Sequence, residues 1–159
     1  MEHNNRETSM HDEERSASAS MQDVRNYLRE VRFAFRRTEV LCERAEKYRT
    51  LAMRATGRTD ALRVSGTPQR SKVETYVLEL VDTHAELQKE INELLSLSRE
   101  AEAWIKKLDD DRYRAVLQLR YLCAMTWEEV ADKMKYNVRW THKMHREAVE
   151  ALARIWSPQ

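Results

Sequence analysis

The stretch from Met125 to Leu152, "MTWEEVADKMKYNVRWTHKMHREAVEAL", predicts two short amphipathic helices separated by a tight break. Thr126 and Glu129 have the spacing of a capping box, in which a hydroxyl and a carboxylate satisfy exposed amides at a helix start. The first helix should end near Lys135, and Asn137 can cap the second, which runs to about Trp156. A short helix, a tight turn and a longer helix are typical of a helix-turn-helix.

The second of these helices is basic in its first two turns. Its apolar residues recur at helical spacing and predict a buried stripe of Thr141, Met144, Ala148, Val149, Leu152 and Ile155. The opposite face has no acidic residue before Glu147. Because a recognition helix contacts base edges with its N-terminal residues, this face predicts binding to double-stranded DNA. The expected DNA-binding residues are Asn137, Arg139, Trp140, His142, Lys143 and Arg146.

Upstream of this pair, three aspartates from Asp109 to Asp111 precede an apolar segment that ends near Leu122. Aspartates favour a helix N-terminus because they accept hydrogen bonds from its free amides and meet the positive end of its dipole. Residues 110–159 are therefore expected to form a three-helix domain of the helix-turn-helix type.

Residues 21–109 contain two heptad seams, which predict two long helices. The first seam is Val24, Tyr27, Val31, Ala34, Thr38, Leu41, Ala45, Tyr48, Ala52 and Ala55. The second is Val73, Val77, Leu80, His84, Leu87, Ile91, Leu94, Ser98, Ala101, Ile105 and Leu108. Residues 56–72, which hold both glycines and Pro68, predict a loop between them.

The charges of the two long segments are complementary. Residues 21–55 carry nine cations and five anions, whereas residues 73–109 carry four cations and nine anions. Matching lengths and opposite charge favour an antiparallel hairpin, with parallel self-pairing of each helix as the competing geometry. Leu28, Phe35, Leu95 and Trp104 lie outside the seams, so a homodimer formed through the hairpin would cover them.

The remaining composition limits the class of protein. Residues 1–20 lack apolar periodicity, which predicts a disordered tail. No apolar run reaches the ~20 residues that span a bilayer, so no membrane contact is expected. Cys42 and Cys123 are far apart and lack CxxC spacing. They predict buried thiols in a reducing bacterial cytoplasm, with a disulfide as the weaker reading.

Catalytic chemistry is not indicated. The chain has no phosphate-cradling glycine loop, nucleophile elbow or paired catalytic carboxylates, so an enzyme and a cofactor are not expected. His142 and His145 lie three residues apart, as in some zinc sites, but no nearby ligand completes a site, and no metal is expected.

Two motifs also resemble a known group of proteins. The region from "RAVLQLRYL", which begins at Arg114, to "REAVEALARI", which ends at Ile155, resembles sigma-factor region four. Together with "TWEEVADKMKYN" it is similar to phage proteins related to the ArpU and RinA late transcription regulators. A long helical hairpin before such a unit also resembles a phage family of unknown function. Ala124 departs from the pattern where a turn glycine is common, and Asn137 where serine usually caps the third helix.

Three functions fit these patterns. The first is a phage or prophage DNA-binding transcriptional regulator. The second is the DNA-recognition small subunit of a phage terminase, which assembly into a ring of eight or more chains would favour. The third is a coiled-coil interaction protein that contacts host RNA polymerase in place of DNA.

Overall fold

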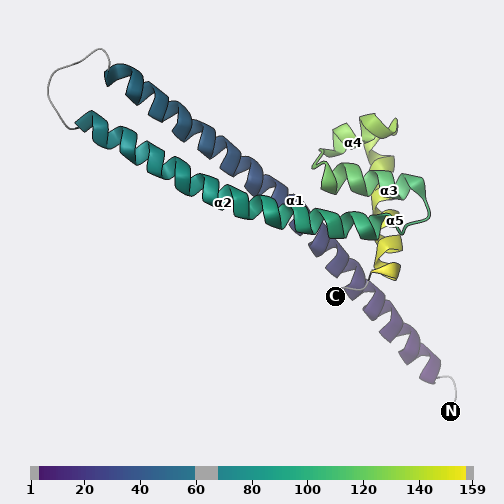
Figure 1. Ribbon diagram of the computed structural model, residues 1–159. Helices are drawn as coiled ribbons and strands as arrows, with labels where there is room; N and C mark the ends of the chain where they lie inside the picture. The colour runs from purple at the N-terminus through teal and green to yellow at the C-terminus, as the bar shows by residue number, and fades with distance from the viewer. Residues whose placement is uncertain (1–3, 60–67, 157–159) are drawn as a thin grey trace. The chain divides into compact units, whose positions relative to one another are not determined.

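The computed structural model describes residues 4–59 and 68–156, and every element in these ranges is a helix (Figure 1). The elements are α1 (Asn4–Thr59), α2 (Pro68–Ile105), α3 (Asp111–Leu117), the π-helical turn η1 (Gln118–Leu122), α4 (Trp127–Met134) and α5 (Val138–Ile155). The predicted all-α fold, a long helix pair followed by a shorter helical domain, is confirmed.

The chain divides into two compact units. One holds residues 34–95, and the other holds the described residues up to Phe33 together with those from Ser96 onward. The boundary predicted at residue 109 therefore lies inside the second unit, because both long helices contribute their ends to it.

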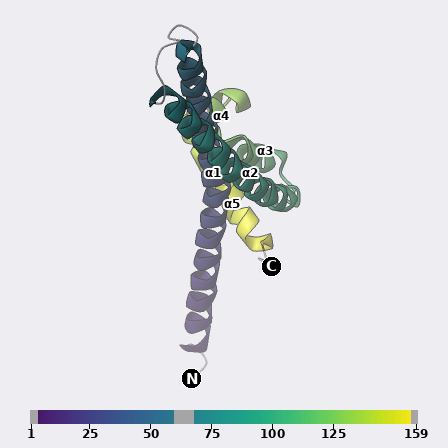
Figure 2. The same cartoon turned by 60° about the vertical axis from the view of Figure 1, so that its left-hand side comes forward.

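In the unit of residues 34–95, α1 and α2 run side by side in opposite directions (Figures 1 and 2). Arg37 forms ion pairs with Glu90 (2.7 Å) and Glu93 (3.1 Å), and Arg44 pairs with Glu86. Partner numbers fall along α2 as they rise along α1, so the pairing is antiparallel. The basic face of α1 thus meets the acidic face of α2, as the charge pattern predicts.

The seam of α1 is confirmed, since its ten predicted residues are all buried or half-buried. The seam of α2 differs from the prediction between Val77 and Leu87. Thr83 is buried, whereas His84 and Val77 are exposed. Leu80 and Leu87 fit a seam that passes through Thr83 as well as one that passes through His84. Periodicity alone therefore did not choose between these two registers. Burial of the smaller Thr83 leaves the imidazole of His84 in water.

Two predicted non-helical segments are shorter in the structure. Residues 4–20 belong to α1, where disorder had been predicted. They contain no glycine or proline, and adding a residue to an existing helix costs far less than nucleating one. Of the predicted loop 56–72, residues 56–59 and 68–72 are helical, and α2 starts at Pro68, a favoured first helical residue. Residues 60–67 lie outside the described residues.

The second unit has one hydrophobic core to which α1, α2 and the C-terminal helices all contribute. Its buried members are Val24, Leu28, Ile105, Leu108, Val116, Leu117, Tyr121, Val130, Met144, Ala148, Val149 and Leu152. Leu28 has no exposed surface, and Trp104 packs against the same cluster. These two residues therefore do not need a second copy of the chain to cover them, contrary to the reasoning from the sequence.

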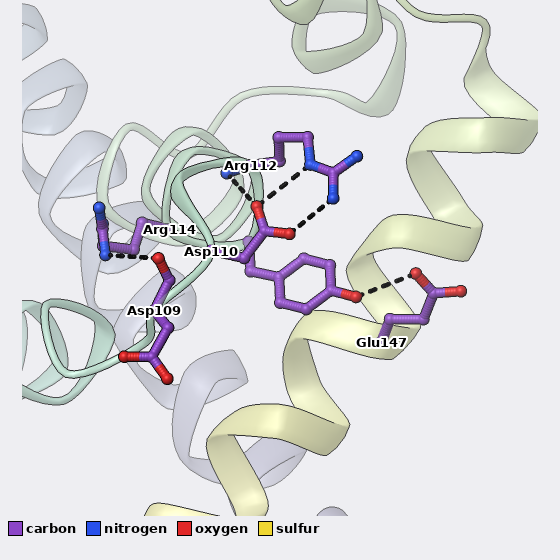
Figure 3. A network of polar contacts seen from close by, with 6 residues as sticks. Asp109, Asp110, Arg112, Arg114 and Glu147 are labelled. Carbon is purple, nitrogen blue, oxygen red and sulfur yellow. Dashed lines mark hydrogen bonds and ion pairs between the residues drawn. The ribbon is translucent and has the colours of Figure 1, made fainter.

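The predicted helix starts are present with their capping side chains. Asp110 accepts from the Arg112 amide (2.8 Å), and its carboxylate also binds the Arg112 guanidinium (Figure 3). The hydrogen bonds from Arg112 lower the pKa of Asp110 to about 2. At α4, Thr126 and Glu129 form the reciprocal capping box, with distances of 2.7 and 3.3 Å.

The turn before α4 places Ala124 in the left-handed region, with φ of 51°. A left-handed conformation costs an L-residue with a Cβ roughly 1–2 kcal/mol, a cost that glycine avoids.

Ala124→Gly is therefore expected to raise the free energy of unfolding by about 1 kcal/mol, as measured by urea denaturation. Ala115→Gly, in the helical conformation of α3, serves as the control and should lower it by a similar amount. Equal destabilisation by both changes would contradict the assigned turn geometry.

Candidate nucleic-acid interface

Helix α5 has one buried face and one exposed face, divided much as its sequence predicts. Thr141, Met144, Ala148, Val149 and Leu152 are buried. Ile155 is 39% exposed, so the predicted stripe stops one turn early. The exposed face holds five of the six predicted DNA-binding side chains, Arg139, Trp140, His142, Lys143 and Arg146, with the sixth, Asn137, at its start.

Asn137 fixes the start of this face. Its side-chain oxygen accepts from the Trp140 amide (2.8 Å), and its backbone carbonyl accepts from the Thr141 amide and hydroxyl. The oxygen of the Asn137 side chain is thus used by the cap, which leaves only its NH₂ group as a donor to a ligand. Lys135, just before it, closes α4 in the left-handed conformation, with φ of 59°.

The cations of the exposed face differ in how firmly they are held. The Lys143 ammonium lies 3.8 Å from Glu147 and 4.9 Å from the centre of the Trp140 ring. Glu147 also accepts from the Tyr113 hydroxyl (3.2 Å), an interaction drawn in Figure 3. Arg139 and Arg146 are exposed and form no ion pair with any residue in the described ranges. They are the cations most available to an anionic partner.

His142 is exposed but does not point freely into solvent. Its ring packs against Trp127 of α4, with 4.2 Å between ring centres. Trp127 also contacts the His145 ring at 4.9 Å and lies 4.3 Å from the Arg120 guanidinium. The aromatic contacts join α4 to α5 beside the basic face and fix the position of His142.

His145 contacts the same Trp127 ring and is more buried than His142. Its Nε2 is 2.8 Å from the Tyr121 hydroxyl. Burial, together with the nearby Arg120 guanidinium, the His142 ring and the Arg25 guanidinium, lowers the pKa of His145 to about 4. The imidazole is therefore neutral at pH 7.

His145 is expected to make the fold acid-sensitive. Its pKa is about 4 in the folded chain and near 6.5 when unfolded, so the unfolded state takes up the proton first. The contribution of neutral His145 to the free energy of unfolding is complete above pH 6.5 and is lost as the pH falls toward 4. This loss amounts to roughly 3 kcal/mol, at about 1.4 kcal/mol per pKa unit. Unfolding in urea at a series of pH values measures it.

His145→Gln keeps a hydrogen-bonding group near Tyr121 but cannot titrate, so its stability should fall less between pH 6.5 and 4 than that of the parent. His84→Gln, at an exposed position of α2, is the control and should follow the parent. Parallel curves for the parent and His145→Gln would show that His145 does not sense this pH range.

The sequence patterns missed a second set of basic residues in the same unit. Arg120 of η1 donates to the Met125 carbonyl (2.6 Å) and lies over Trp127. Arg25, Arg29 and Arg32 of α1 line the same pocket as Arg120, although they are about ninety residues away in the sequence. Their spacing of four and three residues on one helix face was the only available signal.

Other kinds of site were also sought among the described residues. Across residues 4–59 and 68–156, no cluster of three or more histidine, cysteine, aspartate or glutamate side chains could hold a metal ion. In those ranges no helix is both long and apolar enough to cross a bilayer. Cys42 and Cys123 are free and exposed, so the prediction that both thiols are buried is wrong.

Comparison with known proteins gives a family but no function. The chain belongs to the family described as protein of unknown function (DUF1492), whose model matches residues 54–153. The match includes all of α2, α3, η1 and α4 and most of α5. No curated protein and no solved structure matches the chain.

Proposed function

We propose that this member of a family of unknown function is a transcriptional regulator that binds double-stranded DNA through α5. The observation that carries the proposal is the exposed face at the start of that helix. Arg139, Lys143 and Arg146 point away from the core there, and no acid precedes Glu147. The short α4, the three-residue turn and the cap at Asn137 support the proposal, because a helix-turn-helix has the same order of elements before its recognition helix.

The resemblance to sigma-factor region four and to the ArpU and RinA regulators adds the biological setting. We propose a phage or prophage regulator that acts in the cytoplasm of a bacterial host. Ala124 stands where these proteins commonly have glycine. It is compatible with the resemblance, because its backbone has the left-handed conformation that a glycine would adopt.

The test is direct binding of the full chain to DNA. Sites selected from genomic DNA should bind more tightly than scrambled DNA of equal length. If Lys143 and Arg146 meet phosphates, these two contacts of α5 should contribute roughly −2 to the slope of log K against log salt. Fluorescence anisotropy between about 50 and 200 mM salt covers the range in which such binding weakens most clearly. Absence of binding to any duplex at low salt would contradict the proposal, and retained binding to RNA polymerase would then favour the interaction protein.

Self-association through the hairpin is a further part of the proposal. In the unit of residues 34–95, Val40, Val77, Leu78 and Val81 are each more than 40% exposed, which leaves apolar surface that a second copy could cover. A dimer in light scattering is the expected result and agrees with a regulator. A ring of eight or more chains would instead favour the small subunit of a terminase.

A further inference from the structure

A pocket of about 400 Å³ in the second unit is lined almost entirely by cationic and aromatic side chains. It contains no acidic residue. The lining residues are Arg25, Arg29, Arg32, Arg120, Tyr121, Trp127, His142 and His145. Four arginines therefore share one small space without a carboxylate among them.

The arginines of α1 lie on one face of the helix, at positions i, i+4 and i+7. Like charges at this spacing destabilise an isolated helix by a few tenths of a kcal/mol per pair. In the hairpin unit, Arg37 and Arg44 offset such repulsion by pairing with glutamates of α2. Arg25, Arg29 and Arg32 have no ion pair with any residue that the structure describes. The helix therefore keeps a row of cations that nothing described within the fold neutralises.

Arg32 provides a second sign that the pocket is incomplete. Its Nε is buried and has no hydrogen-bond partner in the described part of the chain. A buried donor without an acceptor costs roughly 1–3 kcal/mol. An anionic oxygen in the pocket would remove that cost.

The aromatic wall limits what the ligand can be. Trp127 is already in contact with the Arg120 guanidinium and with the His142 and His145 rings. Its ring is thus not free to stack on a base. Since His145 is neutral at pH 7, attraction comes from the arginines. Guanidinium groups bind phosphate through paired hydrogen bonds, which matches a pocket of this composition.

We propose that this arginine pocket binds phosphate groups and that the backbone of DNA lying along α5 supplies them. The pocket and the exposed face of α5 are continuous through His142, which lines the pocket and lies one turn from both Arg139 and Arg146. The choice of DNA as the source rests on the proposed function. A free polyphosphate is the other source of the same chemistry.

The test uses the double variant Arg25→Gln/Arg29→Gln in the full chain. Its control is Arg36→Gln/Arg49→Gln, which removes two exposed cations of α1 that pair with Glu39 and Glu46 outside the pocket. Inorganic pyrophosphate is titrated by calorimetry at low salt, and DNA affinity is measured over a range of salt concentrations. The double variant should bind pyrophosphate at least tenfold more weakly than the parent and lower the DNA salt slope by about two, while the control matches the parent. If circular dichroism shows misfolding, the exposed single variant Arg29→Gln replaces the double variant, with a slope change of about one.

The possible results separate the two proposals. Loss of pyrophosphate binding together with the smaller salt slope supports a DNA phosphate pocket. Loss of pyrophosphate binding with an unchanged slope overturns DNA as the source and leaves a free polyphosphate. Pyrophosphate binding equal to that of the parent overturns the pocket itself. If the parent binds pyrophosphate but no DNA, the proposed function fails while the pocket stands.

Discussion

Leu28→Asp is expected to unfold the C-terminal helices together with the start of α1. Leu28 has no exposed surface and belongs to the same buried cluster as Leu117 and Leu152. An unpaired carboxylate at this place would cost several kcal/mol, in addition to the lost apolar contacts. A domain of ordinary stability has only about 5–15 kcal/mol to lose.

The near-ultraviolet circular dichroism of the tryptophans measures this effect, because Trp104, Trp127, Trp140 and Trp156 all belong to the second unit. The control is Met53→Asp, on the same helix at a position that is 66% exposed, and its spectrum should match that of the parent. If the tryptophan signal of Leu28→Asp persists up to the parent's melting temperature, α1 does not share a core with the C-terminal helices. The C-terminal helices from α3 onward would then fold alone, as a boundary at residue 109 implies.

This prediction depends on a part of the fold that periodicity could not supply. Seams and caps are local patterns, so the helix starts at Asp110, Thr126 and Asn137 could be predicted from neighbouring residues. Leu28 lies beside the α1 seam at helical spacing, which made it look like a second face of the hairpin. Other members of its buried cluster, such as Val149, are more than a hundred residues away, and a single sequence carries no signal that they share a core.

The same limit explains which parts of the candidate site were predicted. The outward residues of α5 follow from one helix and one cap, and the structure places Arg139, Lys143 and Arg146 on the exposed face as expected. The arginine pocket draws on α1, η1, α4 and α5, so it could be assembled only in three dimensions. Within α2, both registers used Leu80, and only packing decided that Thr83 is buried and His84 is exposed.

Arg139→Ala is expected to reduce the preference for a selected DNA site over a scrambled one by roughly 5- to 150-fold. This corresponds to the ~1–3 kcal/mol of discrimination that a side chain with two hydrogen bonds to a base edge provides. Arg139 is the best placed cation for such a contact. It lies two residues after the cap at Asn137, is exposed, and has no ion pair within the described ranges that a base would have to displace.

Lys143 is expected to behave differently, because it is one turn further along and already interacts with Glu147 and Trp140. Lys143→Ala should weaken all DNA sequences alike and lower the salt slope by about one, as the loss of a phosphate contact would. Competition binding with selected and scrambled duplexes at matched salt separates these two effects. The control is Arg154→Ala, which removes an exposed arginine near the other end of α5 that pairs with Glu150 (2.6 Å).

The pattern across the three variants decides whether α5 reads bases. A loss of discrimination in Arg139→Ala, a uniform loss in Lys143→Ala and parental binding in Arg154→Ala would together assign the start of α5 to the major groove. If Arg139→Ala and Arg154→Ala weaken both duplexes equally, the helix only adds positive charge. Sequence preference would then have to come from another part of the chain, and α5 would not be a recognition helix.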